Sequence, residues 1–232
     1  MVEKNFIPCS TEIFFGFDFE NSMPQGDFGA ILSRAGVGKT SSIVQLALCA
    51  MLNNEKVLHV SLDDPVDKIS LWYKEIFNLI AGTNNISDAD IILEAMLPHR
   101  FIMTFKVDSF TVPKLAERLT DLVEHNIFSP HLIIIDGFNF DDSARETLLE
   151  LKDFVKTRPA KICFTARTHR HEDPGPGVIP EPISGIADLF DVIVQLRPEG
   201  KKIDVVALKK ASEDNNHFGL LMDPATMLLT AE

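Results

Sequence analysis

The stretch Ser33-Arg-Ala-Gly-Val-Gly-Lys-Thr40 is the most informative part of the sequence. It follows a short apolar run, Phe28 to Ser33, and it opens an amphipathic stretch from about Gly38 to Met51. A glycine-rich turn between a strand and a helix, closed by Lys and by Ser or Thr, is the context of a phosphate-binding loop, or P-loop. Its glycines let backbone N–H groups converge on phosphate oxygens, and the helix N-terminus adds a partial positive charge. The stretch therefore predicts a β-α unit whose turn binds a phosphorylated ligand.

The chemistry of such a loop assigns roles to its residues. The ammonium of Lys39 would reach the β- and γ-phosphates of a nucleotide, and the hydroxyl of Thr40 would coordinate Mg²⁺. Ser33 stands where the standard pattern begins with Gly, at a bend that touches no phosphate directly. A chance match in a surface turn is the alternative, which the strand before the loop and the helix after it disfavour. The predicted nucleotide-binding residues are Ser33, Arg34, Ala35, Gly36, Val37, Gly38, Lys39, Thr40 and Ser41.

A second motif is the aliphatic run His131-Leu-Ile-Ile-Ile-Asp136, which ends in an acid and matches the Walker B pattern. An aspartate at the carboxyl end of a strand beside a P-loop can hold Mg²⁺ through water. An ordinary strand that ends at an Asp-Gly turn is the alternative, and the pattern alone is weak. In combination with Lys39 and Thr40 it indicates a Mg-nucleotide site, and we predict that Thr40 and Asp136 hold the metal.

Hydrolysis of a nucleotide needs one more group, a base that activates or orients the attacking water. Asp63 and Asp64 follow a predicted buried strand, and Asp141 and Asp142 lie beyond the Walker B acid. Solvated turn residues or helix caps are the alternative for all four. Capping is favoured for Asp64, because it precedes Pro65 at the start of a predicted helix.

The pattern of the whole chain alternates short apolar runs with longer amphipathic stretches, which is typical of β-α units and of a parallel sheet covered on both faces. We predict an α/β fold with a mostly parallel central sheet, helices on both faces and antiparallel strands at the C-terminal end. The predicted strands span residues 28–33, 57–62, 101–105, 132–135, 161–165, 192–196, 203–209, 219–222 and 227–229. The predicted helices span residues 38–51, a stretch that begins at Pro65, and residues 87–96, 113–128 and 143–156.

The domain organisation follows from the absence of an internal repeat or an interdomain linker in the sequence. We predict a single domain over residues 1–232, with residues 1–22 as an N-terminal extension. Residues 169–182 are rich in Pro, Gly and charge and have no periodicity, which predicts an exposed mobile loop.

The charge of the chain bears on its partners. The 232 residues include 34 acidic and 22 basic side chains, for a formal net charge of −12. This balance argues against a general nucleic-acid binder, although it leaves room for a local basic strip. Arg167, His169 and Arg170 form such a cluster, and neighbouring acidic residues dilute it. We therefore expect a protein partner or self-association rather than a nucleic acid.

The cellular setting is predicted from three further features. The chain has three cysteines and no CxxC pair, which is typical of reduced thiols rather than a disulfide framework. Its first residues lack the apolar core of a signal peptide. No stretch approaches the ~20 apolar residues that cross a bilayer. We expect a cytoplasmic protein with no membrane association.

Together these motifs resemble the RecA-like P-loop ATPases, particularly the DnaB-type replicative-helicase and KaiC-type clock-ATPase branches. The segment Met23 to Thr40 is similar to the entry turn, first strand and P-loop of that family, and Arg34 inside the loop is similar to the helicase version. Leu132 to Asp136 resembles the family's Walker B strand. The resemblance covers most of residues 23–229, and it implies a RecA-like ATPase domain.

The resemblance also implies roles outside the P-loop. Asp63 stands where the family has a catalytic Glu after Ser-Leu, and it is one methylene shorter. Thr165 resembles the family's polar sensor, so we expect the catalytic residues to be Asp63, Lys39 and Thr165. Lys209 resembles the lysine of a Lys-x-Arg motif that reaches the γ-phosphate of a neighbouring subunit, but Ala211 replaces its arginine.

Two other groups of side chains have alternative interpretations. Trp72 and Tyr73 could stack on adenine, but both fall on an apolar helix stripe, so we expect them to pack in the core. His169 and His171 could bind a metal, but they lack the spacing of a structural zinc site, so a solvated loop is favoured.

The expected function is that of a Mg-ATP-binding RecA-like ATPase, with slow hydrolysis and a regulatory or assembly role. Its expected cofactors are ATP and Mg²⁺. One alternative is an ATP-sensing interaction module with little hydrolysis, which Asp63 and Ala211 favour. Another is a DNA-associated recombinase or helicase-like protein, which the net charge disfavours. The P-loop alone would also suit a small-molecule kinase, but the sequence offers no convincing acceptor site or Arg-rich lid.

Overall fold

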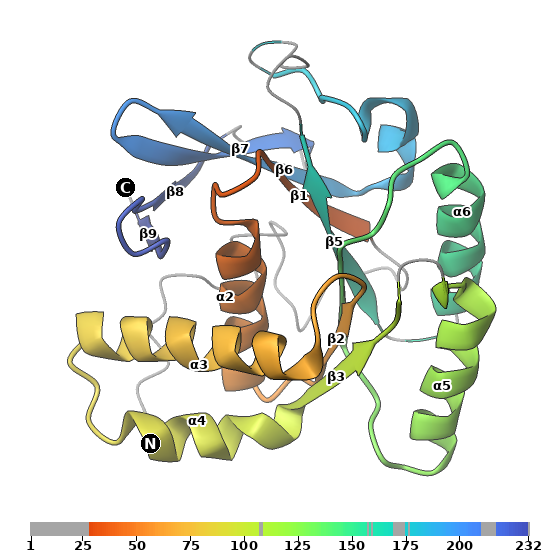
Figure 1. The fold of residues 1–232 in the computed structure, drawn as a ribbon, viewed down its shortest axis with the longest axis horizontal. Helices are drawn as coiled ribbons and strands as arrows, with labels where there is room; N and C mark the ends of the chain where they lie inside the picture. Colours follow the sequence, from red (N-terminus) through yellow and green to blue (C-terminus); the bar gives the residue numbers. More distant parts are fainter. Residues whose placement is uncertain are drawn as a thin grey trace.

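The computed structural model describes residues 28–106, 109–156, 158, 160–168, 175, 177–209 and 217–231. Within these ranges a sheet of nine strands has the order β3-β2-β4-β5-β1-β6-β7-β8-β9 (Figure 1). The strands are β1 (Phe28–Ser33), β2 (Val57–Ser61), β3 (Arg100–Thr104), β4 (Leu132–Asp136), β5 (Lys161–Arg167), β6 (Val192–Glu199), β7 (Lys202–Lys209), β8 (His217–Met222) and β9 (Leu229–Ala231). The helices are α2 (Lys39–Leu52), α3 (Val66–Thr83), α4 (Ala89–Met96), α5 (Val112–Glu124) and α6 (Ala144–Val155), with 3₁₀ turns η1 (Leu97–His99) and η4 (Ser184–Leu189). No helix in the described ranges is both long and apolar enough to cross a membrane.

The sheet has a parallel part and an antiparallel part. The six neighbouring strands from β3 through β6 in the sheet order run parallel. Each connection between two of them that are consecutive in the chain crosses over through a helix or a longer segment. The last three strands extend the sheet as antiparallel neighbours, beginning with the hairpin between β6 and β7. The predicted mixed α/β fold, with a mostly parallel central sheet and antiparallel C-terminal strands, is confirmed.

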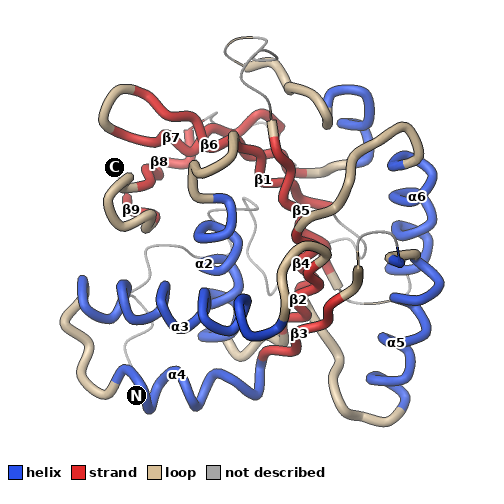
Figure 2. Tube along the Cα trace, viewed as in Figure 1, coloured by secondary structure: helices blue, strands red, loops and turns tan. Residues whose placement is uncertain are grey.

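Helices cover both faces of the parallel part (Figure 2). Successive residues of a strand point to opposite faces, so β4 sends Ile134 to one side and Ile133 and Ile135 to the other. On the side of Ile134 the core is completed by α2, α3 and α4. On the opposite side it is completed by α5, α6 and η4. Because both faces are covered, the aliphatic strands read as continuous apolar runs in the sequence.

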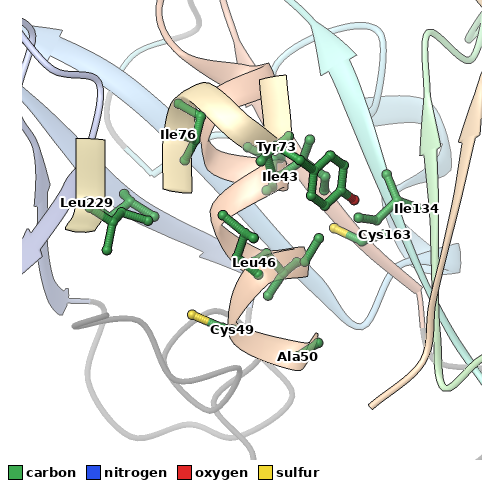
Figure 3. Packing of buried hydrophobic residues seen from close by; sticks show 14 of the residues in the cluster. Ile43, Leu46, Cys49, Ala50, Tyr73, Ile76, Ile134, Cys163 and Leu229 are labelled. Carbon is green, nitrogen blue, oxygen red and sulfur yellow. The ribbon is translucent and has the colours of Figure 1, made fainter. Parts of the chain in front are cut away.

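Helix α2 is buried on all its sides from Ser41 to Met51, whereas an amphipathic helix would bury a single apolar face. Ile43, Leu46 and Ala50 pack in the same core as Tyr73 and Ile134 (Figure 3). The polar residues of the helix are buried too and form hydrogen bonds. The Gln45 Nε2 donates to the carbonyl of Met227 at 3.0 Å, and the Leu229 N–H donates to Gln45 Oε1 at 2.9 Å. The C-terminal turn is thereby attached to the helix that follows the turn after β1.

Three local predictions need correction. The last strand begins at Leu229 rather than Met227, because residues 223–228 form a turn in which the Met227 N–H donates to the Asp223 carbonyl at 2.7 Å. Helix α5 ends at Glu124, four residues before its predicted end. Asp64 does not cap α3, since Pro65 is the N-cap residue and the Asp64 carboxylate instead accepts from Lys68 Nζ at 2.8 Å.

Several predictions fall on residues outside the described ranges. They are the N-terminal extension 1–22, the entry turn 23–27, residues 169–174 and 176 of the predicted loop, and Ala211. The basic residues His169 and Arg170 belong to this group. Arg167, the third member of that basic cluster, ends β5 and is described.

Candidate functional site

A cavity of about 410 Å³ lies at the carboxyl ends of β2, β4 and β5, beside the N-terminus of α2. These strands are parallel neighbours, so the residues that follow them meet at one edge of the sheet. Figure 1 shows this edge next to the turn between β1 and α2. The cavity is lined by Lys39, Thr40, Asp63, Asp64, Asp136, Gly137, Phe138, Asn139, Thr165 and Arg167.

The turn between β1 and α2 has the backbone of an anion-binding loop. Gly36 and Gly38 have φ angles of 76° and 99°, in the left-handed region that favours glycine. The first helical hydrogen bond runs from the Ser42 N–H to the Gly38 carbonyl at 2.9 Å. The N–H groups of residues 39–41 precede that bond, and at a helix N-terminus such groups point toward a ligand. The loop therefore offers backbone donors beside the cavity.

Lys39 places its ammonium over this loop. Its Nζ donates to the carbonyl oxygens of Ser33 at 3.3 Å and Arg34 at 3.4 Å. The pKa of Lys39 is lowered from its ordinary value, chiefly by burial and also by the guanidinium of Arg167. The nearby carboxylate of Asp136 opposes this shift. A partly desolvated ammonium binds an anion more strongly than one in bulk water, because the local dielectric constant is lower.

Asp136 is an acid that the protein buries and orients. The hydroxyl of Thr165 donates to Asp136 Oδ1, and the Gly137 N–H donates to the same hydroxyl at 3.4 Å. The pKa of Asp136 is raised above its ordinary value, chiefly by burial and also by the nearby carboxylate of Asp63. The hydrogen bond from Thr165 opposes this shift. A cation beside Asp136 would favour its charged form. Oxygen ligands of this kind suit Mg²⁺ or Ca²⁺.

Asp63 reaches the cavity from the end of β2 and lies against the turn that follows β4. A Cβ added to Gly137 would lie 2.6 Å from Asp63 Oδ2, and Gly137 has a φ of 83°. The Asp63 carboxylate therefore fits beside residue 137 because that residue is glycine and has no Cβ. Asp64 lines the cavity too, but its carboxylate is paired with Lys68.

The remaining acid candidates serve a turn instead of the cavity. Asp141 Oδ1 accepts hydrogen bonds from the Ser143 N–H at 2.9 Å and from the Ser143 hydroxyl at 2.6 Å. These bonds lower the pKa of Asp141. Neither Asp141 nor Asp142 is among the residues that line the cavity. The alternative interpretation, a role in a turn before a helix, suits Asp141.

Two of the nine predicted nucleotide-binding residues, Lys39 and Thr40, line the cavity. Residues 33–38 and Ser41 are not among the lining residues, although residues 33–38 directly precede Lys39 in the chain. The Ser41 side chain turns elsewhere, since its hydroxyl donates to the Met227 carbonyl at 2.7 Å. Ser41 could thus contribute its backbone N–H to a ligand, while its side chain holds the C-terminal turn.

Sequence reasoning missed four of the lining residues: Gly137, Phe138, Asn139 and Arg167. The first three directly follow Asp136, so their position after a buried strand was a signal for them. Arg167 lies two residues beyond Thr165 on β5, and strand periodicity places both on the same side. Arg167 was assigned from the sequence to a basic cluster with His169, and so was not placed beside Thr165 on the strand.

The aromatic prediction for α3 is confirmed. Tyr73 is fully buried, and its hydroxyl lies 3.0 Å from His59 Nδ1. Trp72 is partly buried and packs against the same core. Neither lines the cavity. Lys209, which the resemblance assigns to a neighbouring subunit's phosphate, donates from Nζ to the carbonyl of Ala187 at 2.9 Å within this chain.

No protein-family model matches the chain, and no curated protein matches it. Among the described residues, no three His, Cys, Asp or Glu side chains gather to form a metal-binding cluster.

Proposed function

We propose that the chain binds Mg-ATP in a RecA-like P-loop fold, with the loop of residues 33–41 around the phosphates. One observation carries the proposal. Lys39, Thr40 and Asp136, which the sequence motifs select independently, line a single cavity although they come from α2 and β4. A chance P-loop match in a surface turn gives no reason for a Walker B acid to meet it there.

Each residue has a task in this proposal. The backbone N–H groups at the start of α2 and the ammonium of Lys39 bind phosphate oxygens. The Thr40 hydroxyl and the Asp136 carboxylate are the oxygen donors for Mg²⁺, which takes its other ligands from phosphates and water. When bound, Mg²⁺ neutralises charge on the phosphate oxygens. Thr165 orients Asp136 through their hydrogen bond.

Slow hydrolysis is the second part of the proposal, and Asp63 is its base. The Asp63 carboxylate lines the same cavity and lies against Gly137, next to Asp136. From there it can accept a proton from a water that attacks the terminal phosphate. An ATP-sensing module with little hydrolysis is the second candidate, because the Asp63 side chain is one methylene shorter than the Glu of the family it resembles.

A regulatory or assembly role with a protein partner completes the proposal. The formal net charge of −12 supports a protein partner over nucleic acid. Arg167, the described member of the predicted basic cluster, lines the cavity proposed for the nucleotide. The protein partner could be a second copy of this chain. A DNA-associated role is the disfavoured alternative.

The decisive experiment is substitution of Lys39 by Ala. We expect Mg-ATP to raise the midpoint of thermal unfolding of the wild-type chain, since a ligand at 100 times its Kd stabilises by about 2.7 kcal/mol. Lys39→Ala should abolish this shift, because it removes the phosphate-binding charge. Lys201→Ala, in the exposed turn between β6 and β7, is the matched control and should keep the shift. An equal shift in Lys39→Ala and in the wild type would refute the proposal.

A further inference from the structure

Arg167 lines the candidate site from β5, a strand that the sheet order places beside both β1 and β4. Strand β5 lies between β1, which leads into the P-loop, and β4, which ends in Asp136. Arg167 is the last residue of β5 and is paired in register with Ser33, the first residue of the loop. The Thr168 N–H donates to the Ser33 carbonyl at 3.0 Å and holds this end of β5 against the loop. The backbone of Arg167 is thus fixed beside the P-loop.

The side chain of Arg167 faces the cavity from this fixed position. It lines the cavity together with Lys39, Thr40 and Asp136, and it lies close enough to Lys39 to lower the pKa of that ammonium. The side chain of Arg167 is exposed, so its guanidinium remains accessible to a ligand. Two cations near one cavity repel each other, and an anion placed between them relieves that repulsion.

The cations and acids of the cavity indicate which part of a nucleotide Arg167 would meet. Thr40 and Asp136 are the proposed metal donors, and Asp63 is the proposed base, so this end of the site would receive the terminal phosphate. A guanidinium can donate two parallel hydrogen bonds to phosphate oxygens, which an ammonium cannot. Arg167 therefore has the chemistry to recognise a terminal phosphate with three free oxygens.

We infer that Arg167 is a second cationic ligand of the terminal phosphate, supplied by the same chain, and that it makes the site prefer a nucleoside triphosphate over a diphosphate. This inference rests on the proposed function. It gives the site a phosphate-binding arginine although Ala211 stands where the resembling family carries one from a neighbouring subunit. The preference needs no second copy of the chain.

The test compares two nucleotides on the full chain by isothermal titration calorimetry with Mg²⁺. One is a non-hydrolysable ATP analogue and the other is ADP. For the wild type we expect tighter binding of the analogue, at a ratio that does not change with protein concentration. Arg167→Ala should weaken the analogue about tenfold to a hundredfold, because a hydrogen bond to a charged group is worth about 1.5–3 kcal/mol, and should change ADP binding less than threefold.

Two other variants make the result specific. Arg167→Lys keeps the charge and loses the paired hydrogen bonds, so its affinity for the analogue should lie between those of the wild type and Arg167→Ala. Arg145→Ala removes an exposed arginine that pairs with Asp188 and does not line the cavity, and it should bind both nucleotides as the wild type does. Thermal unfolding without nucleotide checks that each variant is folded.

The outcomes separate the inference from the function on which it rests. An Arg167→Ala variant that keeps the wild-type ratio of the two affinities, or that weakens both nucleotides by the same factor, overturns the inference. The proposed ATP site still stands if the wild type binds Mg-ATP and Lys39→Ala does not. Failure of the wild type to bind either nucleotide refutes the proposed function itself.

Discussion

The parallel and antiparallel parts of the sheet contribute to the candidate site in different ways. In the parallel part, β2, β4 and β5 each end in side chains that line the cavity, among them Asp63, Asp136 and Thr165. In the antiparallel part, β8 and the turn before β9 contribute no lining residue within the described ranges. Chemistry is thus concentrated at strand ends on one side of the sheet.

The antiparallel part instead contacts the turn between β1 and α2 and the first turns of α2. The Ser41 hydroxyl and the Gln45 amide both donate to the Met227 carbonyl, and the Met222 side chain lies against Gly38. These contacts join the first turns of α2 to a segment more than 180 residues later in the chain. The parallel part thus supplies the side chains of the cavity, and the antiparallel part holds the backbone at the start of α2 in place. Each part of the sheet can be tested separately.

The largest expected effect concerns a strand-end side chain of the parallel part. Asp63→Asn should lower steady-state ATP hydrolysis about a hundredfold or more, because general-base catalysis contributes about 10²–10⁴. ATP affinity should stay within about threefold, since Asp63 is not a proposed phosphate ligand. Phosphate release and nucleotide titration on the same sample measure the two quantities.

The matched control for that substitution is Asp64→Asn. Asp64 also lines the cavity, but its carboxylate is held by Lys68, so hydrolysis should change little. If Asp63→Asn turns over ATP at the wild-type rate, Asp63 is not the base. Equal losses in the two variants would point to the total negative charge of the cavity instead of one residue.

This division also explains which features the sequence could predict. The parallel strands are continuous aliphatic runs, so their positions and the acids that follow them were predictable, and Lys39, Thr40 and Asp136 meet as expected. The role of Arg167 was missed because the sequence does not show whether this residue ends a strand or begins a basic loop. The pairing of β5 with β1, which only the structure shows, places it beside Ser33. The attachment of Met227 to Ser41 and Gln45 was not predictable, because no local pattern links residues so far apart.

The next effect tests the contact between the two parts at Gly38. Gly36 and Gly38 both have positive φ, so an Ala at either residue costs about 1–2 kcal/mol of folding free energy. A Cβ at residue 38 would also overlap Met222 Sδ, whereas one at residue 36 meets no atom within 4 Å. We expect Gly38→Ala to destabilise by about 2–3 kcal/mol, because the end of the Met222 side chain must also move, which adds about 1 kcal/mol to the backbone cost. Gly36→Ala should cost about 1–2 kcal/mol in the same urea-unfolding measurement.

A double-mutant cycle assigns the extra cost to the antiparallel part. Met222→Ala removes the atoms that a Cβ at residue 38 would meet, so Gly38→Ala should cost about 1 kcal/mol less in that background. Equal costs for Gly36→Ala and Gly38→Ala, or no coupling with Met222→Ala, would show that β8 does not support the loop.

The smallest effect arises inside the parallel part, at His59 on β2. Burial, and to a smaller extent the charge of Arg100, lower the pKa of His59 from an ordinary value of 6.5 to about 3 in the folded chain. The unfolded chain therefore binds a proton that the folded chain excludes as the pH falls below about 6.5. The stability from neutral His59 is fully present above that pH and should fall by up to about 1.4 kcal/mol per pH unit below it.

His59→Gln removes the titrating group, so the slope of unfolding free energy against pH should become shallower between pH ~6 and ~4.5. The raised pKa of Asp136 acts in the opposite direction, since protonation there favours the folded chain, but it is common to wild type and variant and cancels in the difference. Tyr73→Phe is the control, because it removes the hydroxyl near His59 Nδ1 and keeps the buried imidazole, so it should retain the wild-type slope. Identical slopes for His59→Gln and the wild type would mean that His59 does not resist protonation. The parallel core would then tolerate a charged imidazole beside Tyr73 of α3.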